Sequence, residues 1–234
     1  KTRILSENPK ALFIHCYNHA LNLAVMDTLN KIILFKDAMS YSEELIKLFK
    51  KSPKRDTLFK KLKLEACDES PGLKDMATTR WTVKGDCLSR IINNYKLVYQ
   101  DLEQSLYEET RVEMKSRLNG VMFQMRNFNY FFGICLAKEI LLVTDNLAVA
   151  LQKKDLSALE GHELYKITAK ALKDMKAEDY ENFWEITVKK AGELDVKEPE
   201  LKRKIKKPVR FFICGQKEDE NVPETPKEQF KKIF

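Results

Sequence analysis

The chain is poor in turn-forming residues, and this constrains its fold more than any other feature. It contains 7 Gly and 7 Pro in 234 residues. A β-rich fold needs a turn roughly every 8–12 residues, and those turns draw heavily on Gly and Pro. We therefore predict a mainly α-helical protein. Its length is sufficient to bury a sizeable core.

Apolar residues recur at helical spacing along most of the chain, which predicts a series of amphipathic helices. The first carries Leu21, Val25, Leu29 and Ile32 on one stripe. Further helices are expected over 43–51, 52–63, 81–107, 134–152, 157–175 and 180–188. Residues 11–16 form a short apolar run behind Pro9 and are the one segment that favours a strand.

Local signals predict where several of these elements begin. Ser52 precedes Pro53 and can cap a helix whose first residue is that proline. Asp155 or Ser157 can cap the helix that follows, and 225–228 reads as a capping box. Residues 64–77 are expected to form a loop. An aromatic run is expected in the core, and comprises Phe123, Phe128, Tyr130, Phe131 and Phe132.

The formal net charge is +7, which favours acidic partners such as nucleic acid but equally serves solubility. Five dispersed Cys indicate reduced thiols rather than a disulfide framework. No membrane span is expected, because the apolar run at 140–151 is short and interrupted by Asp145. Both ends interrupt patterns typical of helices, so we expect a fragment of a longer protein.

Two short motifs carry groups capable of chemistry. Cys16 and His19 have the spacing of half a zinc site or of a Cys–His nucleophile pair, but further ligands and an oxyanion hole are absent from the sequence pattern. A half-buried Cys and a His bonded to a carbonyl are favoured on chemistry alone. Arg80 beside Trp81 can clamp a phosphate and stack on a base. A core Trp with a surface Arg is the favoured alternative for an isolated dipeptide.

Two basic stretches are further candidates for nucleic-acid contact. Residues 47–63 hold eight Lys or Arg against one acid, Asp56. Such a stretch either tracks phosphates or forms a solvated helix face, and the sequence leaves both open. The run at 202–210 reads as a nuclear localisation signal or a hydrated loop, with the loop favoured. Residues 195–226 as a whole are expected to be a long exposed connection.

Four motifs in this order together resemble the hAT-family transposases, and especially the transposase-derived region of zinc finger MYM-type proteins. The first block surrounds Cys16 and His19. The second is 52–55, the third is Thr79-Arg80-Trp81, and the last is 151–156. The family-signature residues are Cys16, His19, Arg80, Trp81, Leu151, Gln152 and Asp155. The segment 226–234 is similar to the stretch before the family's C-terminal part.

This resemblance implies an RNase H-like α/β core interrupted by a large all-helical insertion. Residues 1–39 would be part of the core, with the strand at 11–16 and the following helix. Residues 40–195 would be the helical insertion, 196–226 a charged linker, and 227–234 the start of a further core helix. The expected fold class is therefore mainly α, with one or two strands.

The resemblance also implies a nuclear DNA-binding protein. The family's catalytic Asp-Asp-Glu triad would lie outside residues 1–234, so no catalysis and no cofactor are expected from this segment. Mg²⁺ or Mn²⁺ would serve only an active full-length parent. The resemblance implies that Arg80 and Trp81 contact DNA and that His19 orients DNA or supports the site. The basic stretch at 47–63 adds Lys54 and Arg55 as candidate DNA contacts.

Family likeness further implies a homodimer formed through a C-terminal region, and no membrane partner. The parent is either an active transposase or a domesticated descendant that only binds DNA. A helical protein–protein interaction scaffold derived from a transposase is the alternative function. A metal-binding module at Cys16 and His19 is a third.

Overall fold

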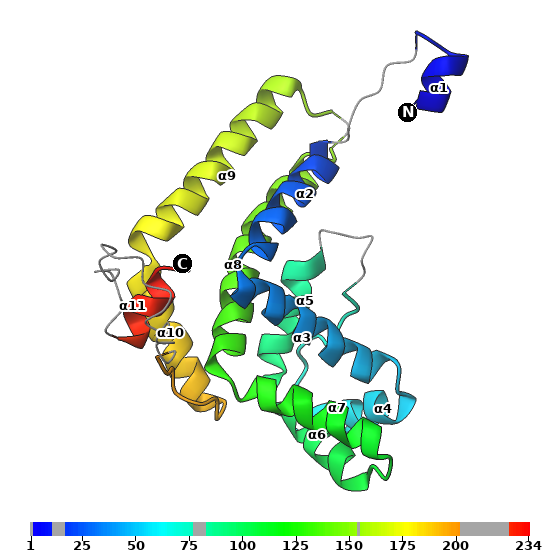
Figure 1. Ribbon diagram of the computed structural model, residues 1–234, viewed down its shortest axis with the longest axis vertical. Helices are drawn as coiled ribbons and strands as arrows, with labels where there is room; N and C mark the ends of the chain where they lie inside the picture. The colour runs from blue at the N-terminus through cyan, green and yellow to red at the C-terminus, as the bar shows by residue number, and fades with distance from the viewer. Residues whose placement is uncertain (1, 11–16, 77–82, 154, 202–224) are drawn as a thin grey trace, which may run out of the picture.

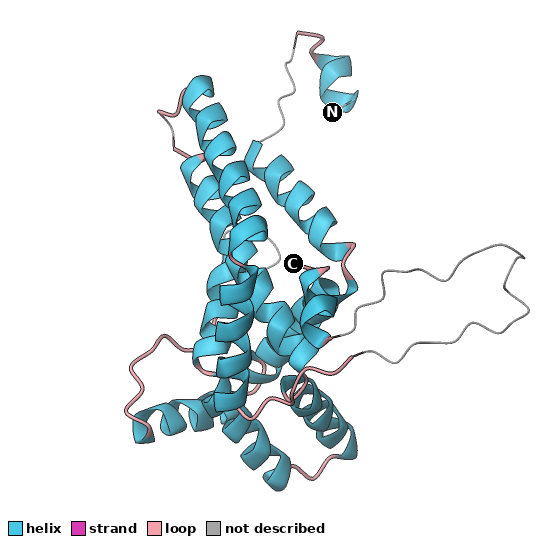
Figure 2. Cartoon of the chain, turned by 90° about the vertical axis from the view of Figure 1, so that its left-hand side faces the viewer, coloured by secondary structure: helices cyan, strands magenta, loops and turns pink. Residues whose placement is uncertain are grey.

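The computed structural model describes residues 2–10, 17–76, 83–153, 155–201 and 225–234. The regular elements among these residues are all helices, connected by loops, as Figure 2 shows. The helices are α1 (Thr2–Glu7), α2 (Tyr17–Asn30), α3 (Ile33–Lys50), α4 (Pro53–Glu65), α5 (Lys84–Asn93), α6 (Tyr95–Glu108), α7 (Val112–Met125), α8 (Phe128–Ala150), α9 (Ala158–Glu178), α10 (Tyr180–Glu193) and α11 (Pro226–Lys231).

The prediction of a mainly α-helical protein is confirmed, and the described residues contain no strand. The expected strand at 11–16 lies outside the described residues. The RNase H-like part of the fold class therefore stays a prediction. The boundary expected between 39 and 40 falls within α3, which continues unbroken from Ile33 to Lys50.

Helix α8 is the centre of the fold, and α3, α5 and α9 pack along it (Figure 1). Its 23 residues are buried around most of the helix circumference in the first half. Gly133 permits the closest approach, since a Cβ atom there would lie 2.9 Å from the Cβ of Ala38 on α3. A glycine at this crossing thus sets the spacing of α3 and α8.

An aromatic cluster joins the C-terminal helix to the rest of the core. Phe230 of α11 is fully buried against Phe128, Phe132 and Trp184. Its ring centroid lies 4.6 Å from that of Phe132. Residues 225–234 therefore belong to the same core as α8 and α10.

The caps expected from sequence are confirmed. The Ser52 hydroxyl accepts a hydrogen bond from the Arg55 backbone N–H, and α4 begins at Pro53. Of the two residues considered as a cap for α9, Ser157 is the one used, in a complete capping box with Glu160. Thr225 caps α11 in the expected way.

The single helix expected over 81–107 is wrong, because α5 ends at Asn93 and α6 begins at Tyr95. Asn94 lies between them with its side chain buried. Its amide donates to the carbonyls of Arg90 and Pro71, and its Oδ1 accepts from Lys63. These bonds to a distant loop compete with continued helix, as Asn side chains do.

One assignment to the core is also wrong. Phe123 is 61% exposed, whereas the other four aromatic residues of its run are buried. Helix α7 turns Leu118, Val121, Met122 and Met125 inward, which places Phe123 on the opposite face. On α9, Ile167 and Ala171 are exposed, and Leu164, Leu172 and Met175 are half-buried.

Candidate nucleic-acid interface

The structure describes some of the predicted contact residues and not others. Cys16, Arg80 and Trp81 lie outside the described residues, as does the basic run at 202–210. The remaining predicted residues lie within them, namely His19, Lys54, Arg55, Leu151, Gln152 and Asp155. The geometry of the site is therefore built from these residues and from the elements that flank the others.

Helices α2 and α5, which flank the first and third motifs, touch each other. His19 is exposed in the first turn of α2. Seven residues further along the same helix, Met26 lies with its Sδ 3.8 Å from the Nζ of Lys84. Lys84 is the first residue of α5 and follows Trp81 by three positions. Seven helical residues rise only about 10 Å, so His19 and the first residue of α5 border one region.

The contact between α2 and α5 covers a buried charged cluster. Lys84 is 7% exposed, and burial lowers the pKa of its ammonium group while the charges of Glu43 and Asp145 act against that shift. Asp145 of α8 is buried, and burial raises the pKa of its carboxyl to about 6. Its Oδ2 has no hydrogen-bond partner among the described residues. Four helices thus bring ionisable or soft groups together beside the third motif.

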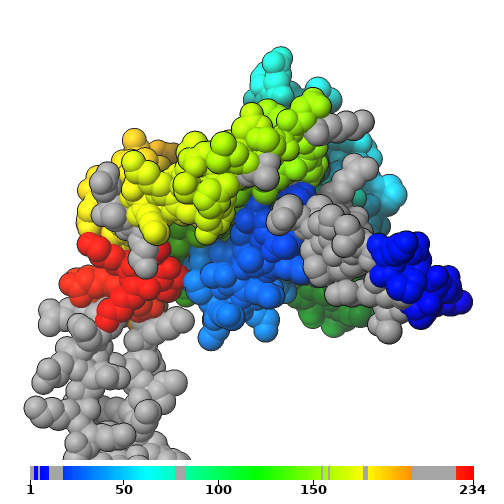
Figure 3. Space-filling view, turned by 90° about the horizontal axis from the view of Figure 1, so that it is seen from above, coloured from blue at the N-terminus to red at the C-terminus, as the bar shows by residue number. Residues whose placement is uncertain are grey.

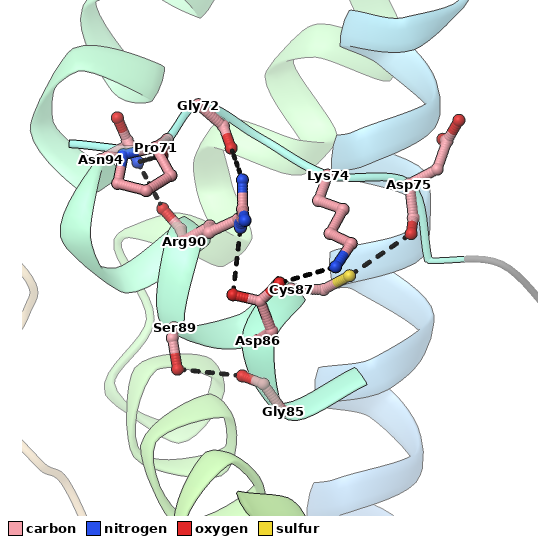
Figure 4. Close-up of polar contacts among 10 residues, drawn as sticks. All are labelled: Pro71, Gly72, Lys74, Asp75, Gly85, Asp86, Cys87, Ser89, Arg90 and Asn94. Carbon is pink, nitrogen blue, oxygen red and sulfur yellow. Dashed lines mark hydrogen bonds and ion pairs between the residues drawn. The ribbon is translucent and has the colours of Figure 1, made fainter. Parts of the chain in front are cut away.

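The loop that leads into the third motif is fastened to α5, as Figure 4 shows. The Arg90 guanidinium donates to the Gly72 carbonyl and to Asp86. Lys74 also binds Asp86, at 2.9 Å. The Cys87 thiol donates to the Asp75 carbonyl, and burial raises the pKa of that thiol to about 11. Both ends of the segment that carries Arg80 and Trp81 are therefore held by α5.

The last signature block follows the end of α8. Leu151 forms the C-cap of α8 and is half-buried, while Gln152 and Asp155 are exposed. Figure 1 places the end of α8 beside the beginning of α2, at the upper end of the molecule. Figure 3, viewed from that end, shows α2 and α3 in blue beside the yellow-green atoms of α9. The beginning of α2, which carries His19, and the end of α8, which Leu151 caps, therefore lie at one end of the fold.

The basic stretch at 47–63 is mostly neutralised by acidic side chains. Lys54 forms an ion pair with Glu108 at 2.9 Å, although Glu108 is remote in sequence. Four further pairs join lysines of this stretch to acids, namely Lys47–Glu43, Lys60–Asp56, Lys61–Glu65 and Lys63–Asp68. Lys50 and Lys51 are exposed, and no ion pair links them to another described residue.

Arg55 is 8% exposed and points into the protein. Its Nε donates to the Leu48 carbonyl at 2.7 Å, which ties α4 to α3. Burial lowers the pKa of its guanidinium, and the charge of buried Asp101 on α6 acts against that shift. This geometry gives Arg55 a role in packing the helices. The sequence pattern alone had grouped it with Lys54 as a DNA contact.

Sequence reasoning missed a second cationic area, at the end of α7. Arg126 and Lys197 are exposed there, beside the rings of Tyr99 and Phe123. The spacing of the buried residues of α7 could have revealed that Phe123 faces outward. Lys197 could not have been assigned to this area, because it is 71 positions from Arg126 in the sequence.

No group of three or more His, Cys, Asp or Glu side chains with metal-site geometry occurs within the described part of the chain. Cys16, the partner of His19 in the metal-binding alternative, is outside it. None of the helices in the described ranges combines the length and the apolar character needed to cross a bilayer.

No protein-family model matches this chain, and no solved structure matches its fold.

Proposed function

We propose that this chain is the helical part of an hAT transposase-like nuclear protein and that it binds duplex DNA through the upper end of the fold. The contact between Lys84 and Met26 carries the proposal, because it sets α2 and α5 together beside the first and third motifs. Catalysis is assigned to groups outside residues 1–234, and Mg²⁺ or Mn²⁺ would serve only the complete parent.

The geometry supports this site over the basic stretch at 47–63. Five lysines of that stretch already hold acidic partners, and an ion-paired lysine gains little from exchanging a carboxylate for a phosphate. By contrast, α5 binds Gly72, Lys74 and Asp75 in the loop that leads towards the third motif. His19 is exposed on the adjoining helix.

Fluorescence anisotropy with a labelled duplex of about 20 base pairs tests the proposal across a salt series. The double variant Arg80→Ala with Trp81→Ala should lose about 1–3 kcal/mol of binding free energy. Lys61→Ala is the matched control, since it removes a cation that is already paired with Glu65. Equal duplex affinity for the wild type and the double variant would show that the third motif does not contact DNA.

A helical protein-interaction scaffold is the second candidate, and exposed apolar side chains on α9 favour it. Leu159, Tyr165 and Ile167 are all more than half exposed. If the wild type fails to bind duplex DNA even at low salt, this candidate moves ahead. Sedimentation velocity over a concentration series then tests self-association, and Ile167→Ser should weaken any association through α9.

A further inference from the structure

The corner where α7 ends exposes an aromatic ring that the fold does not use for packing. Phe123 is 61% exposed on the outer face of α7. Helical side chains lean over the preceding turn, and in this case that turn contains Gly120. A Cβ atom built on Gly120 would meet no heavy atom within 4 Å. The 61% exposure of Phe123 therefore leaves much of its side chain open to solvent.

Two cations stack on aromatic rings at this corner. The Nζ of Lys197 lies 5.7 Å from the ring centroid of Phe123. The guanidinium carbon of Arg126 lies 5.0 Å from the ring centroid of Tyr99. The backbone N–H of Lys197 donates to the Arg126 carbonyl at 2.9 Å. This bond couples the two cation–ring pairs into one cluster, which we call the α7 corner.

The cations of the α7 corner differ from those of the 47–63 stretch in their partners. Neither Arg126 nor Lys197 forms an ion pair with another described residue. Glu103, one turn along α6 from Tyr99, is the acid whose charge reaches the Tyr99 hydroxyl. Cations without a carboxylate partner keep their attraction for phosphate, and Phe123 remains 61% exposed beside its cation.

We propose that the α7 corner binds single-stranded nucleic acid. An unpaired base stacks on the open side of the Phe123 ring, and the neighbouring phosphates contact Arg126 and Lys197. Bases of a duplex are already stacked on each other and cannot reach an exposed ring, so the site selects unpaired strands. An acidic peptide would use the two cations but would gain little from the phenyl ring.

This inference is independent of the duplex site proposed above. Figure 1 shows α6 and α7 at the lower end of the molecule, away from the beginning of α2 and the end of α8. No residue of the α7 corner belongs to the signature blocks. The two sites can therefore be tested separately with two probes and two sets of variants.

The test is anisotropy of a fluorescein-labelled oligothymidylate of about 20 nucleotides, bound to the whole 234-residue chain. Phe123→Ala should weaken binding about 5- to 150-fold, the range for loss of one base stack. Phe123→Leu, which keeps the apolar character but removes the aromatic face, should weaken it similarly. Arg126→Ala should lower the slope of log affinity against log salt by about 0.7.

Tyr107→Ala is the matched control, because Tyr107 is 91% exposed and has no cation over its ring among the described residues. It should leave oligothymidylate binding within about twofold. Circular dichroism checks that each variant is folded. Phe123→Ala should leave duplex affinity unchanged. The oligothymidylate result therefore stands or fails separately from the proposal that the chain binds duplex DNA.

Two results would overturn the inference. One is no binding of oligothymidylate by the wild type at low salt. The other has two parts: wild type and Phe123→Ala bind labelled oligothymidylate with equal affinity, and polyglutamate displaces that label as effectively as unlabelled oligothymidylate does. That second result would mean that the corner attracts polyanions by charge alone.

Discussion

The 47–63 stretch and the α7 corner are both cationic, but they make their cations available to different degrees. In the 47–63 stretch, five lysines are paired with carboxylates from α3, α4, α6 and the loop that follows α4, and Arg55 is buried. In the second, two cations lie over aromatic rings and remain exposed. The positive charge available to a ligand therefore depends on which acidic side chains the fold places beside each cation. A count of Lys and Arg along the sequence overestimates this charge in the 47–63 stretch and misses it at the α7 corner.

The largest effect in this comparison should come from Arg55→Ala. This change removes the bond to the Leu48 carbonyl and leaves buried Asp101 without its neighbouring cation. We expect a loss of about 3 kcal/mol in the free energy of unfolding, measured by urea denaturation. Arg126→Ala, in the exposed corner, should change it by less than about 0.5 kcal/mol. Similar losses for both would mean that Arg55 is not a packing residue.

The next effect concerns Asp101, the buried acid beside Arg55. Asp101→Asn removes the carboxylate charge from this fully buried position, so it should stabilise the fold at pH 8 by about 1–3 kcal/mol. Thermal unfolding as a function of pH provides the measurement. A destabilised Asn variant at pH 8 would contradict the idea that the carboxylate is under-solvated.

The pH dependence has a definite sign. Burial raises the pKa of the Asp101 carboxyl to about 7 in the folded state, above the value near 4 of an unfolded chain. The folded state therefore binds more protons between these values, and stability contributed by Asp101 is lost as the pH rises from about 4 through 7. Asp145, with its pKa raised to about 6, acts in the same direction. Asp101→Asn should flatten the dependence of stability on pH between about 4 and 7. An unchanged slope would mean that another group takes up the proton in this range.

A smaller effect, on duplex affinity, is expected when the acidic partners of the lysines in the 47–63 stretch are removed. The triple variant Asp56→Asn, Glu65→Gln, Glu108→Gln removes the partners of Lys60, Lys61 and Lys54. Duplex affinity at low salt should rise roughly three- to tenfold, because three more cations can reach phosphates. Stability should change by less than about 1 kcal/mol per pair, since exposed ion pairs contribute little. An unchanged affinity would mean that this face does not approach DNA.

The smallest effect is expected for Lys54→Ala. The basic stretch at 47–63 makes Lys54 a candidate DNA contact, but its ammonium group is held by Glu108 at 2.9 Å. Duplex affinity should therefore change by less than about twofold in anisotropy. A tenfold loss would show that Lys54 exchanges its carboxylate for a phosphate, and would bring the 47–63 stretch back into the interface.

Local chemistry could be predicted from sequence, and long-range partners could not. Ser52, Ser157 and Thr225 act as caps because each bonds to a backbone N–H three residues away. The break at Asn94 depends on Pro71 and Lys63, which lie 23 and 31 positions away. Helical periodicity alone cannot reveal such partners.

The same distinction applies to the candidate sites. The pairing of Lys54 with Glu108 and the placement of Lys197 beside Phe123 both join distant parts of the chain. The motif order suggested which residues to combine at the upper end, and the contact between Met26 and Lys84 supports that grouping for the flanking helices. Cys16, Arg80 and Trp81 themselves remain predictions from the sequence.

The burial of Phe230 links the length of an expressed chain to its behaviour in solution. This ring fills the space beside Phe128, Phe132 and Trp184. A recombinant product that stopped before residue 225 would present those three aromatic side chains to water. Apolar surface of that kind promotes self-association, so such a product should be polydisperse on size-exclusion chromatography. We therefore expect residues 225–234 to protect the chain from aggregation by covering this aromatic surface.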